Sequence, residues 1–545
     1  MSAAPAVGEL RSALTVATLT VRRTARSGAL WGLLFGVLIF NEAVSYHTSN
    51  PTPASREDLV RTFGDNTALT AIIGPARQLD TAGGFVSWRL LALLVWVGAI
   101  WGLLTATRVL RREEDTGRWE LLLAGRTTRR RATAEAIGGL AAGWLVLWGL
   151  SATFTVVAGS RSTVGFSTSG SLLYATAATA SAAMFLAIGA LASQLATTRR
   201  QANGLAALVF AAAFLIRLIA DSADGAGWLR WASPLGWIEE LRPLTGAQPL
   251  ALVPIALLVA GASGLAIVLA GRRDVGAAML TRRAPVRAHT RLLDSSALLV
   301  VRLERWVALA WIGGLAVTGA IFGITARSAA QGNVAVHEIE QAVGRLGAHP
   351  ANATTAWIGY EFLYIAALLS FAAAGQIAAM RSEEADGHLD HLLARSLDRR
   401  AWVAGRLGFG AAFVIASALA AALAAWAGSA SGPGGAGLGP MLQAGLNLIP
   451  TALLILGLGT LLLGVAPRLA MPLLYALVLW SFLIEIVGTS ITSSQWLLDT
   501  ALFTHVGPVP AASLDWPAMG ILTGLALIAG LAGLATFARR DLLAA

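Results

Sequence analysis

The sequence lacks lysine and cysteine and carries little charge of either sign. Only 13% of its 545 residues are charged, 56% are hydrophobic, and all 40 basic residues are arginine. A soluble domain carries about 25% charged residues, so this composition would leave too much apolar surface facing water. The missing lysine excludes a Walker A ATP site. The missing cysteine excludes disulfides, thiol catalysis and cysteine-bound metal clusters. The composition indicates a membrane protein that is not itself a Walker-type ATPase.

Long apolar stretches recur along the whole chain. A helix needs about 20 such residues to cross a bilayer, where it satisfies its own backbone hydrogen bonds. The sequence predicts twelve spans, at 29–46, 86–107, 135–158, 171–195, 202–220, 249–270, 306–326, 357–380, 403–427, 441–465, 470–488 and 518–537. We therefore expect an all-α integral membrane protein with about twelve transmembrane helices.

The arginines predict the orientation of these spans. With the N-terminus placed in the cytoplasm, 30 of the 40 arginines fall on the inner side, as the positive-inside rule requires. Both termini are then cytoplasmic. The net charge of +10 mostly sets the orientation of the spans in the membrane. It also favours contact with anionic lipid headgroups. Because the arginines are spread over seven inner segments, we expect no nucleic-acid partner.

An internal repeat divides the chain. Residues 111–130 and 381–400, here named the first and second charged segments, are identical at nine of 20 positions. A second match, at nearly the same offset, pairs 214–217 with 482–485. The repeat predicts two parallel six-helix units related by a pseudo-two-fold axis along the membrane normal.

The predicted units have simple bounds. The first is 1–270, the second is 292–545, and the arginine-rich stretch 271–291 is a cytoplasmic linker. Each unit begins with an amphipathic helix lying on the membrane surface, at 9–27 and 292–305. Before the sixth span, the Trp-rich stretch 228–244 predicts a pair of short interfacial or re-entrant helices.

Acidic residues in the two charged segments are the main candidate site. Glu113, Gly117 and Glu120 share one face of a helix, and acidic residues favour a helix's first turn. We expect a short helix along the cytoplasmic surface with its acidic face toward the cytosol. The mid-segment glycine indicates a bend or a close approach. A solvated surface anchor is the simpler interpretation, but two equivalent copies favour docking of two identical partner subunits.

With its six-span units, amphipathic lead-ins and repeated E-E-x-x-G-x-x-[ED]-x-L-L-A segment, the chain resembles the permeases of ABC-2 type exporters. The fused form is similar to actinobacterial permeases of the tetronasin/polyketide-antibiotic exporter type. The resemblance implies coupling helices that contact a separate homodimeric ATP-binding-cassette ATPase. The residues implied are Glu113, Glu114, Gly117, Glu120, Glu383, Glu384, Gly387 and Asp390. The second segment has His388, Leu389 and His391 where the first has Arg118, Trp119 and Leu121, so the two docking sites need not be equivalent.

The resemblance also implies what the chain does and where. ATP and Mg would be bound by the partner, with no cofactor in this chain. The substrate would be a hydrophobic drug- or antibiotic-like molecule or a lipid, exported across a bacterial cytoplasmic membrane. The pathway would lie between the halves.

Charged residues inside predicted spans are functional candidates, because they are costly there. Arg217 and Glu485 occupy matching positions near the outer ends of two spans, and we predict either an inter-half ion pair that helps close the pathway or two snorkelling side chains. Glu361 either meets Arg89 or a cationic substrate, or lies at a solvated helix end. His388 and His391 are not expected to bind metal.

Two other function classes fit the sequence less well. A secondary, proton-coupled multidrug transporter of the major-facilitator type also has two six-helix halves, but it would need carboxylates deep in its spans, and none lies near a midplane. A membrane transferase would need acidic or His clusters on an outer loop, and no such motif forms. No catalytic constellation stands out, and we expect a non-enzymatic permease subunit.

Overall fold

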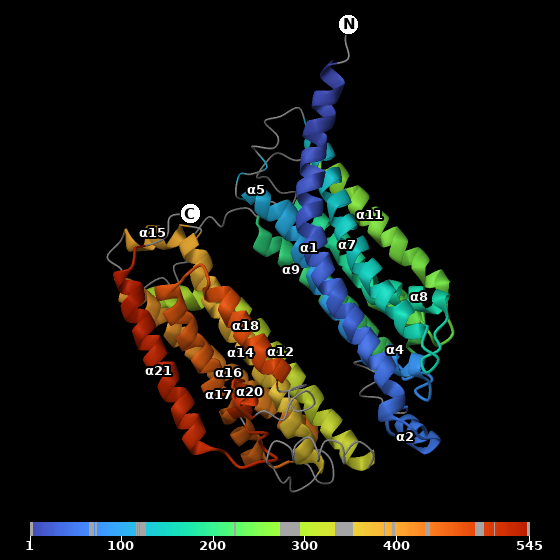
Figure 1. Cartoon of the computed structure of the whole chain (residues 1–545). Coiled ribbons are helices and arrows are strands. Elements are labelled where there is room, and N and C mark those ends of the chain that lie inside the picture. Colours follow the sequence, from blue (N-terminus) through green and yellow to red (C-terminus); the bar gives the residue numbers. More distant parts are fainter. Residues whose placement is uncertain are drawn as a thin grey trace. The chain divides into compact units, whose positions relative to one another are not determined.

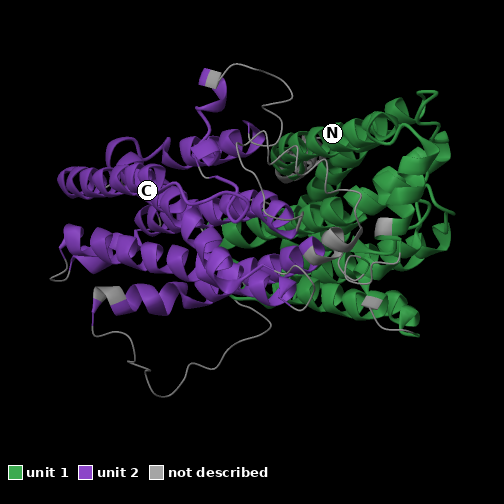
Figure 2. Cartoon of the chain, turned by 90° about the horizontal axis from the view of Figure 1, so that it is seen from below, with its two compact units in different colours: residues 1–285 green, residues 286–545 purple. Residues whose placement is uncertain are grey.

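The computed structural model describes residues 4–64, 70, 73–115, 117, 119, 127–222, 225–272, 295–332, 353–385, 387–394, 398–430, 436–484, 495–505 and 507–541. Within these ranges the regular elements are all helical. Eleven of the helices are long and apolar enough to cross a membrane. The predicted all-helical membrane class is therefore confirmed. The chain forms two compact units, 1–285 and 286–545 (Figure 2), and each is described by itself.

Six long helices build the first unit (Figure 1), and α8 is the most buried of them. Its elements are α1 (Ala4–Ser49), α2 (Pro53–Phe63), α4 (Ala82–Thr107), the π-helical turn η1 (Arg108–Arg112), α5 (Glu113–Asp115), α7 (Arg129–Gly159), α8 (Thr168–Leu195), α9 (Arg199–Ser222), the 3-10 turn η2 (Gly227–Ala232), α10 (Pro234–Glu240), η3 (Pro249–Ala251) and α11 (Leu252–Ala270). The short helices η2 and α10 form the pair predicted between the fifth and sixth spans.

The second unit is also helical where the structure describes it. Its elements are α12 (Ser296–Gly332), α14 (Ala353–Ala385), α15 (His388–Leu393), α16 (Arg399–Ser429), α17 (Leu438–Val465), α18 (Ala470–Leu483), α20 (Gln495–Leu498), η5 (Phe503–His505) and α21 (Trp516–Arg539). At the predicted eleventh span, 470–488, the described helix α18 has 14 residues, fewer than a straight crossing needs. Residues 485–494 lie outside the described ranges.

The predicted surface-lying lead-in helices are not separate elements. α1 runs without interruption from Ala4 to Ser49, and Figure 1 shows it as one long rod. α12 likewise continues from Ser296 into the following span. The prediction was wrong because arginines among apolar residues do not by themselves end a helix, and neither stretch contains a proline or a glycine pair that would bend it.

Small residues hold the helices of the first unit close together. α1 packs along α7, where a Cβ added to Gly143 would meet Thr24, and one added to Gly28 would overlap the Gly143 carbonyl. The Thr24 hydroxyl donates to the carbonyl of Gly139 at 2.7 Å. The Gly139-x-x-x-Gly143 pattern thus marks a helix contact, as such patterns do in membranes.

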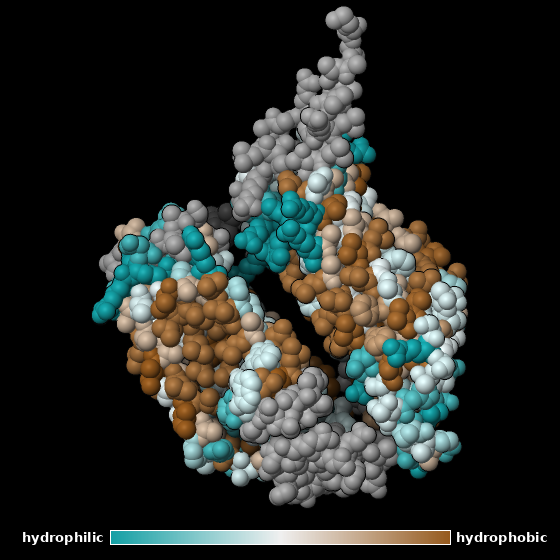
Figure 3. Space-filling view, in the orientation of Figure 1, coloured by the Kyte–Doolittle hydropathy of each residue, from teal (hydrophilic) through white to brown (hydrophobic). Residues whose placement is uncertain are grey.

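The outward surfaces of the long helices are apolar. Figure 3 shows hydrophobic residues over the helices of each unit and hydrophilic residues gathered toward their ends. Exposed examples are Leu30, Leu33 and Leu34 on α1, and Leu527, Ile528 and Leu531 on α21. An apolar surface of this extent suits contact with lipid rather than water.

Candidate functional site

The first charged segment begins as the end of a long helix. α4, η1 and α5 form one helical run from Ala82 to Asp115. Arg111 is buried, and its guanidinium donates to Asp115 at 3.0 Å and to Glu114 at 3.2 Å. The Glu114 side chain is only 8% exposed. The acidic residues thus lie at the negative end of this helix, where they are unfavourable unless cations neutralise them.

Asp115 links this helix end to the start of another span. Its second carboxylate oxygen accepts a hydrogen bond from the backbone N–H of Arg199, the first residue of α9, at 3.0 Å. An acidic side chain is favourable at a helix N-terminus. Arg111 also donates to the carbonyl of Thr197, and Thr107 donates to Asn203 at 2.6 Å. The ends of α4 and α9 are therefore fastened to each other.

The second charged segment has a similar arrangement with different partners. Glu384, near the end of α14, accepts from Arg540 at 2.7 Å and lies 3.5 Å from Arg381; its side chain is 2% exposed. Glu383 pairs with Arg406 of α16, which also lies 3.5 Å from Glu304 of α12. In the first unit, Glu113 instead pairs with Arg23 of α1 at 2.9 Å. Both segments thus tie a helix end to neighbouring helices of the same unit.

The glycine of each segment ends its helix. Gly117 and Gly387 have φ angles of +73° and +70°, in the left-handed region that glycine adopts without strain. Each donates its backbone N–H to the third residue before it, Glu114 at 3.0 Å and Glu384 at 3.1 Å. A Cβ at either position would meet nothing within 4 Å. Of the two predicted roles, a bend and a close approach, the bend is confirmed.

The described acidic residues do not form the predicted acidic face toward the cytosol. Glu113 and Glu114 belong to the last turn of a helix rather than the first turn of a new one, and their carboxylates face arginines of their own unit. Beyond the glycine, the second segment continues as α15, in which Leu389 is buried while His388, Asp390 and His391 are exposed. Glu120 lies outside the described residues. A role in coupling stays a prediction for all eight residues.

Arg217 lies in an ion-pair network within its own unit. Its guanidinium is 3.0 Å from Asp221 on the same helix and 3.5 Å from Glu239 of α10. Arg230 of η2 contacts the same two carboxylates, at 2.6 Å and 3.1 Å. Glu485, the predicted mate of Arg217, lies outside the described residues. The inter-half pair therefore stays a prediction.

The other two charged candidates have partners within their own units. Arg89 forms an ion pair with Glu42 of α1 at 3.1 Å. Glu361 accepts a hydrogen bond from Thr325 at 2.9 Å, and its second oxygen has no exposed surface and no hydrogen-bond partner. Glu361 is partly exposed on α14, and its hydrogen bond to Thr325 joins α14 to α12. The aromatic rings of Tyr360 and Tyr364 lie edge to face beside it along α14.

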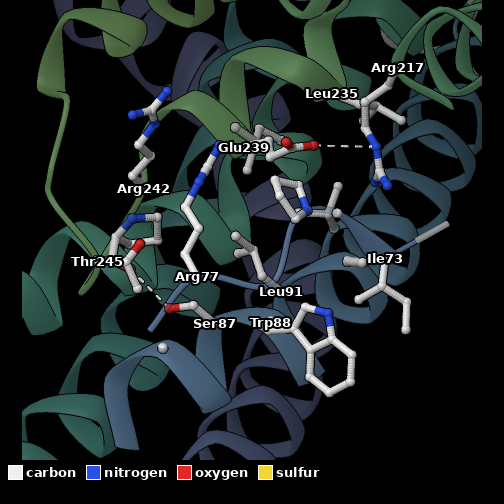
Figure 4. Close-up of a pocket in the computed structure, with 17 residues that line it drawn as sticks. Ile73, Arg77, Ser87, Trp88, Leu91, Arg217, Leu235, Glu239, Arg242 and Thr245 are labelled. Atoms are coloured by element: carbon white, nitrogen blue, oxygen red, sulfur yellow. Dashed lines mark hydrogen bonds and ion pairs between the residues drawn. The ribbon is translucent and has the colours of Figure 1, made fainter. Parts of the chain in front are cut away.

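A pocket opens at the end of the first unit where α4 begins and α9 ends (Figure 4). It contains about 540 Å³ of empty space, part of it open to solvent. We name it the arginine pocket, because its polar lining is dominated by Arg77, Arg217 and Arg242, with Glu239 among them. Its apolar lining includes Trp88, Leu91, Val95, Leu235 and Ile238.

Charge in this pocket is not balanced. Arg217 and Arg230 share Asp221 and Glu239, and Arg242 pairs with Glu240 at 2.8 Å. Arg77 has no described carboxylate within 4.0 Å, and Figure 4 shows it between Arg242 and Glu239. Burial lowers the pKa of Arg77 and so do Arg242 and Arg230, against the opposing effect of Glu239 and Glu240. Its cation is thus poorly compensated.

Glu239 is the carboxylate of this pocket. Burial and the neighbouring Asp221 raise its pKa to about 8, although Arg217 and Arg230 act in the opposite direction. When Glu239 is protonated, the ionised carboxylates that the described residues place beside the four arginines are Asp221 and Glu240. The pocket then carries a larger surplus of positive charge.

The backbone around the pocket is strained. The described non-glycine residues with positive φ are Gln78 at 51°, Arg242 at 43° and Leu244 at 64°. All three belong to the two loops that carry Arg77 and Arg242 into the pocket. Conformations of this kind cost about 1–3 kcal/mol each and cluster at functional sites.

Sequence reasoning found only Arg217 among these pocket residues. Arg77, Glu239 and Arg242 come from segments distant in sequence, and no motif joins them. The signal available was the Trp-rich stretch 228–244, which carries two carboxylates and two arginines between apolar residues. Charges in such a stretch are costly unless they meet partners.

The eleven span-length apolar helices among the described residues define a multi-pass membrane protein. The family model described as "Multidrug efflux system permease Rv1217c, C-terminal domain" matches residues 54–271 and 293–538. The chain belongs to this family of efflux permeases. It is 28% identical over 540 residues to the multidrug efflux system permease protein Rv1217c of Mycobacterium tuberculosis, with 96% of this chain and 94% of that protein covered.

Proposed function

We propose that this chain is the membrane subunit of an ATP-binding-cassette exporter of the ABC-2 type, with a separate ATPase docked on its two charged segments. The observation that carries the proposal is the matched helix-end geometry: in both units arginines hold a Glu-Glu pair, and a left-handed glycine is the third residue after that pair. Two similar sites suit a partner made of two identical subunits. Membership of a multidrug efflux permease family supports export as the process.

The proposed architecture is two parallel six-helix repeats, in which α18 belongs to the eleventh of twelve spans, at 470–488. Both termini and both charged segments would face the bacterial cytoplasm, where 30 of the 40 arginines would lie. The partner would bind ATP and Mg, since this chain contains no lysine for a Walker A site. Substrates would be hydrophobic drug- or antibiotic-like molecules or lipids, as in the tetronasin-type subtype. The major-facilitator alternative is not favoured by the relatives.

The buried ion pairs suggest how motion would pass through the first unit. α4 and α9 are fastened together at the charged segment by Arg111, Asp115 and the N-terminus of α9. The same two helices carry lining residues of the arginine pocket at their other ends. A push on the turn at Gly117 would therefore move two joined helices as one body. The carboxylates would position the segment, and residues beyond the glycine would touch the ATPase.

Asp390 offers the sharpest test, because its exposed side chain lies on α15 beyond the glycine. We expect Asp390→Arg to reduce copurification of a coexpressed Walker-type ATPase and drug efflux by at least about tenfold, since a charge reversal in an interface costs more than about 1.4 kcal/mol. The matched control is Glu57→Arg, which reverses an exposed acidic residue on α2. Normal ATPase binding and efflux by Asp390→Arg would contradict docking at α15.

A further inference from the structure

We propose that the arginine pocket of the first unit binds an oxyanion carried on an apolar body, with the anion at Arg77 and Arg242 and the apolar part on the Trp88–Leu91–Leu235 side. This site goes beyond the coupling proposal and does not depend on an ATPase. The chemistry is that of an amphiphilic carboxylate or phosphate, whether a lipid headgroup or a free molecule.

The charge inventory supports an anionic ligand. Among the described residues, four arginines lie in or beside the pocket, Arg77, Arg217, Arg230 and Arg242, with three carboxylates, Asp221, Glu239 and Glu240. Each of these carboxylates lies within 4.0 Å of Arg217, Arg230 or Arg242, whereas none of them lies that close to Arg77. Arg242 also has a buried Nε without a hydrogen-bond partner. A planar guanidinium presents two parallel N–H groups to a carboxylate or phosphate, which makes arginine the preferred residue for such anions.

The apolar residues that line the pocket support a ligand whose anionic group is attached to an apolar part. Trp88, Leu91 and Val95 of α4 line the pocket together with Leu235 and Ile238 of α10. The Trp88 indole N–H is buried without an acceptor, so a ligand oxygen could also accept a hydrogen bond there. Apolar surface with a few convergent polar groups is the usual composition of a small-molecule site.

A hydrogen bond, a close backbone approach and strained loop residues hold the pocket open. The loop after residue 242 is fixed to α4 by a hydrogen bond from Ser87 to the carbonyl of Pro243 at 2.9 Å. Gly74, at φ +110°, passes beside the Glu239 carboxylate, where a Cβ would lie 3.5 Å from Oε2. Together with the strained backbone at Gln78, Arg242 and Leu244, these contacts hold the arginines around space instead of letting them collapse onto one another.

The test is binding of dodecyl phosphate to the purified full chain in a neutral maltoside detergent, measured by isothermal calorimetry. We expect saturable binding that is weakened about tenfold or more by Arg77→Gln and largely restored by Arg77→Lys, because a charge-assisted hydrogen bond contributes about 1.5–3 kcal/mol. The matched control is Arg61→Gln, on an exposed arginine of α2. Dodecyltrimethylammonium, with the same chain and the opposite charge, should not bind in the pocket.

Two further measurements separate the sources of the ligand. Native mass spectrometry should detect phosphatidylglycerol retained by the wild type and lost from Arg77→Gln if the ligand is a lipid headgroup. If no lipid is retained and dodecyl phosphate still binds, the ligand is a free amphiphile. Equal binding by the wild type and Arg77→Gln, or equal binding of the cationic surfactant, would overturn the proposal. If the ATPase docks normally but no anion binds, the anion site is overturned and the proposed ATPase docking is not.

Discussion

Arg540 donates a hydrogen bond to Oε2 of Glu384 at 2.7 Å, and so joins the residue that follows α21 to the end of α14. The two residues are 156 positions apart in sequence. Arg23 and Glu113 make the corresponding type of link in the first unit, between α1 and the end of α4. In each unit the Glu-Glu pair is therefore part of the packing between helices.

Replacing Arg540 by alanine should destabilise the second unit. The Glu384 carboxylate would stay buried, with Arg381 3.5 Å away, and we expect a loss of about 2 kcal/mol in the free energy of unfolding. Thermal unfolding of the purified chain measures the effect. Arg539→Ala is the control, since Arg539 is an exposed neighbour on the same helix. Equal melting temperatures for the two variants would show that the buried pair contributes nothing to stability.

The left-handed turn at Gly387 should tolerate asparagine better than alanine. No atom lies within 4 Å of a Cβ there, so the cost of Gly387→Ala is the backbone conformation alone, about 1–2 kcal/mol. Asparagine adopts this conformation more readily. We expect efflux to fall in the order glycine, asparagine, alanine, as α15 loses its direction. Drug accumulation in cells expressing both subunits is the measurement.

Gly138→Ala gives the matched control for the turn variants. Gly138 is exposed within α7, and a Cβ there also meets nothing within 4 Å. Its helical backbone accepts alanine, so efflux should be unchanged. If Gly387→Ala and Gly138→Ala both leave efflux intact, the direction of α15 is not needed for coupling.

Hydropathy predicted the helical class and most of the spans, because a run of apolar residues long enough to cross a bilayer has few other structures available. The charged segments were harder. Glu113 and Glu114 favour the first turn of a helix as isolated residues, but in the structure the helix from Ala82 continues through them. Arg23 and buried Arg111 make this possible by pairing with Glu113 and Glu114. Arg111 also donates to the carbonyl of Thr197, 86 residues away, so its position depends on a distant segment.

Replacing Gly28 by leucine should separate α1 from α7. An added Cβ would overlap the carbonyl oxygen of Gly143, and this backbone atom cannot rotate away as a side chain can. Forcing the two helices apart costs about 1–3 kcal/mol or more. We expect a lower melting temperature and lower yield in detergent. Gly138→Leu, on the exposed side of α7, should leave both unchanged; equal loss from the two variants would contradict a specific helix contact at Gly28.

The contacts that form the arginine pocket could not be predicted from the sequence alone. Arg217 was recognisable, since a charge in an apolar run is conspicuous. Its relation to Glu239 was not, because it depends on η2 and α10 folding back beside the end of α9. The surplus charge of the pocket is a property of four segments brought together, and it can be counted only after the fold is known.

Binding of an anionic amphiphile to the arginine pocket should weaken as the pH rises. The pKa of Glu239 is raised to about 8; below that pH the residue is neutral and the pocket carries one more net positive charge. The groups that face Glu239 are Arg217 and Asp221 of α9, Arg230 of η2, and Arg77, Glu240 and Arg242 in or beside the pocket. None of the arginines loses its charge in this range.

The affinity falls with rising pH because the ionised Glu239 carboxylate repels an anionic ligand. The affinity is therefore highest below about pH 8, where Glu239 is protonated. A sulfonate bile salt keeps its own charge constant, and its affinity should be roughly fivefold weaker at about pH 9 than at about pH 6. Glu239→Gln should bind about as tightly at both pH values as the wild type does at the lower one. A pH dependence that survives unchanged in Glu239→Gln would assign the titration to another group, whereas its disappearance would identify Glu239 as the residue that sets the charge of the pocket.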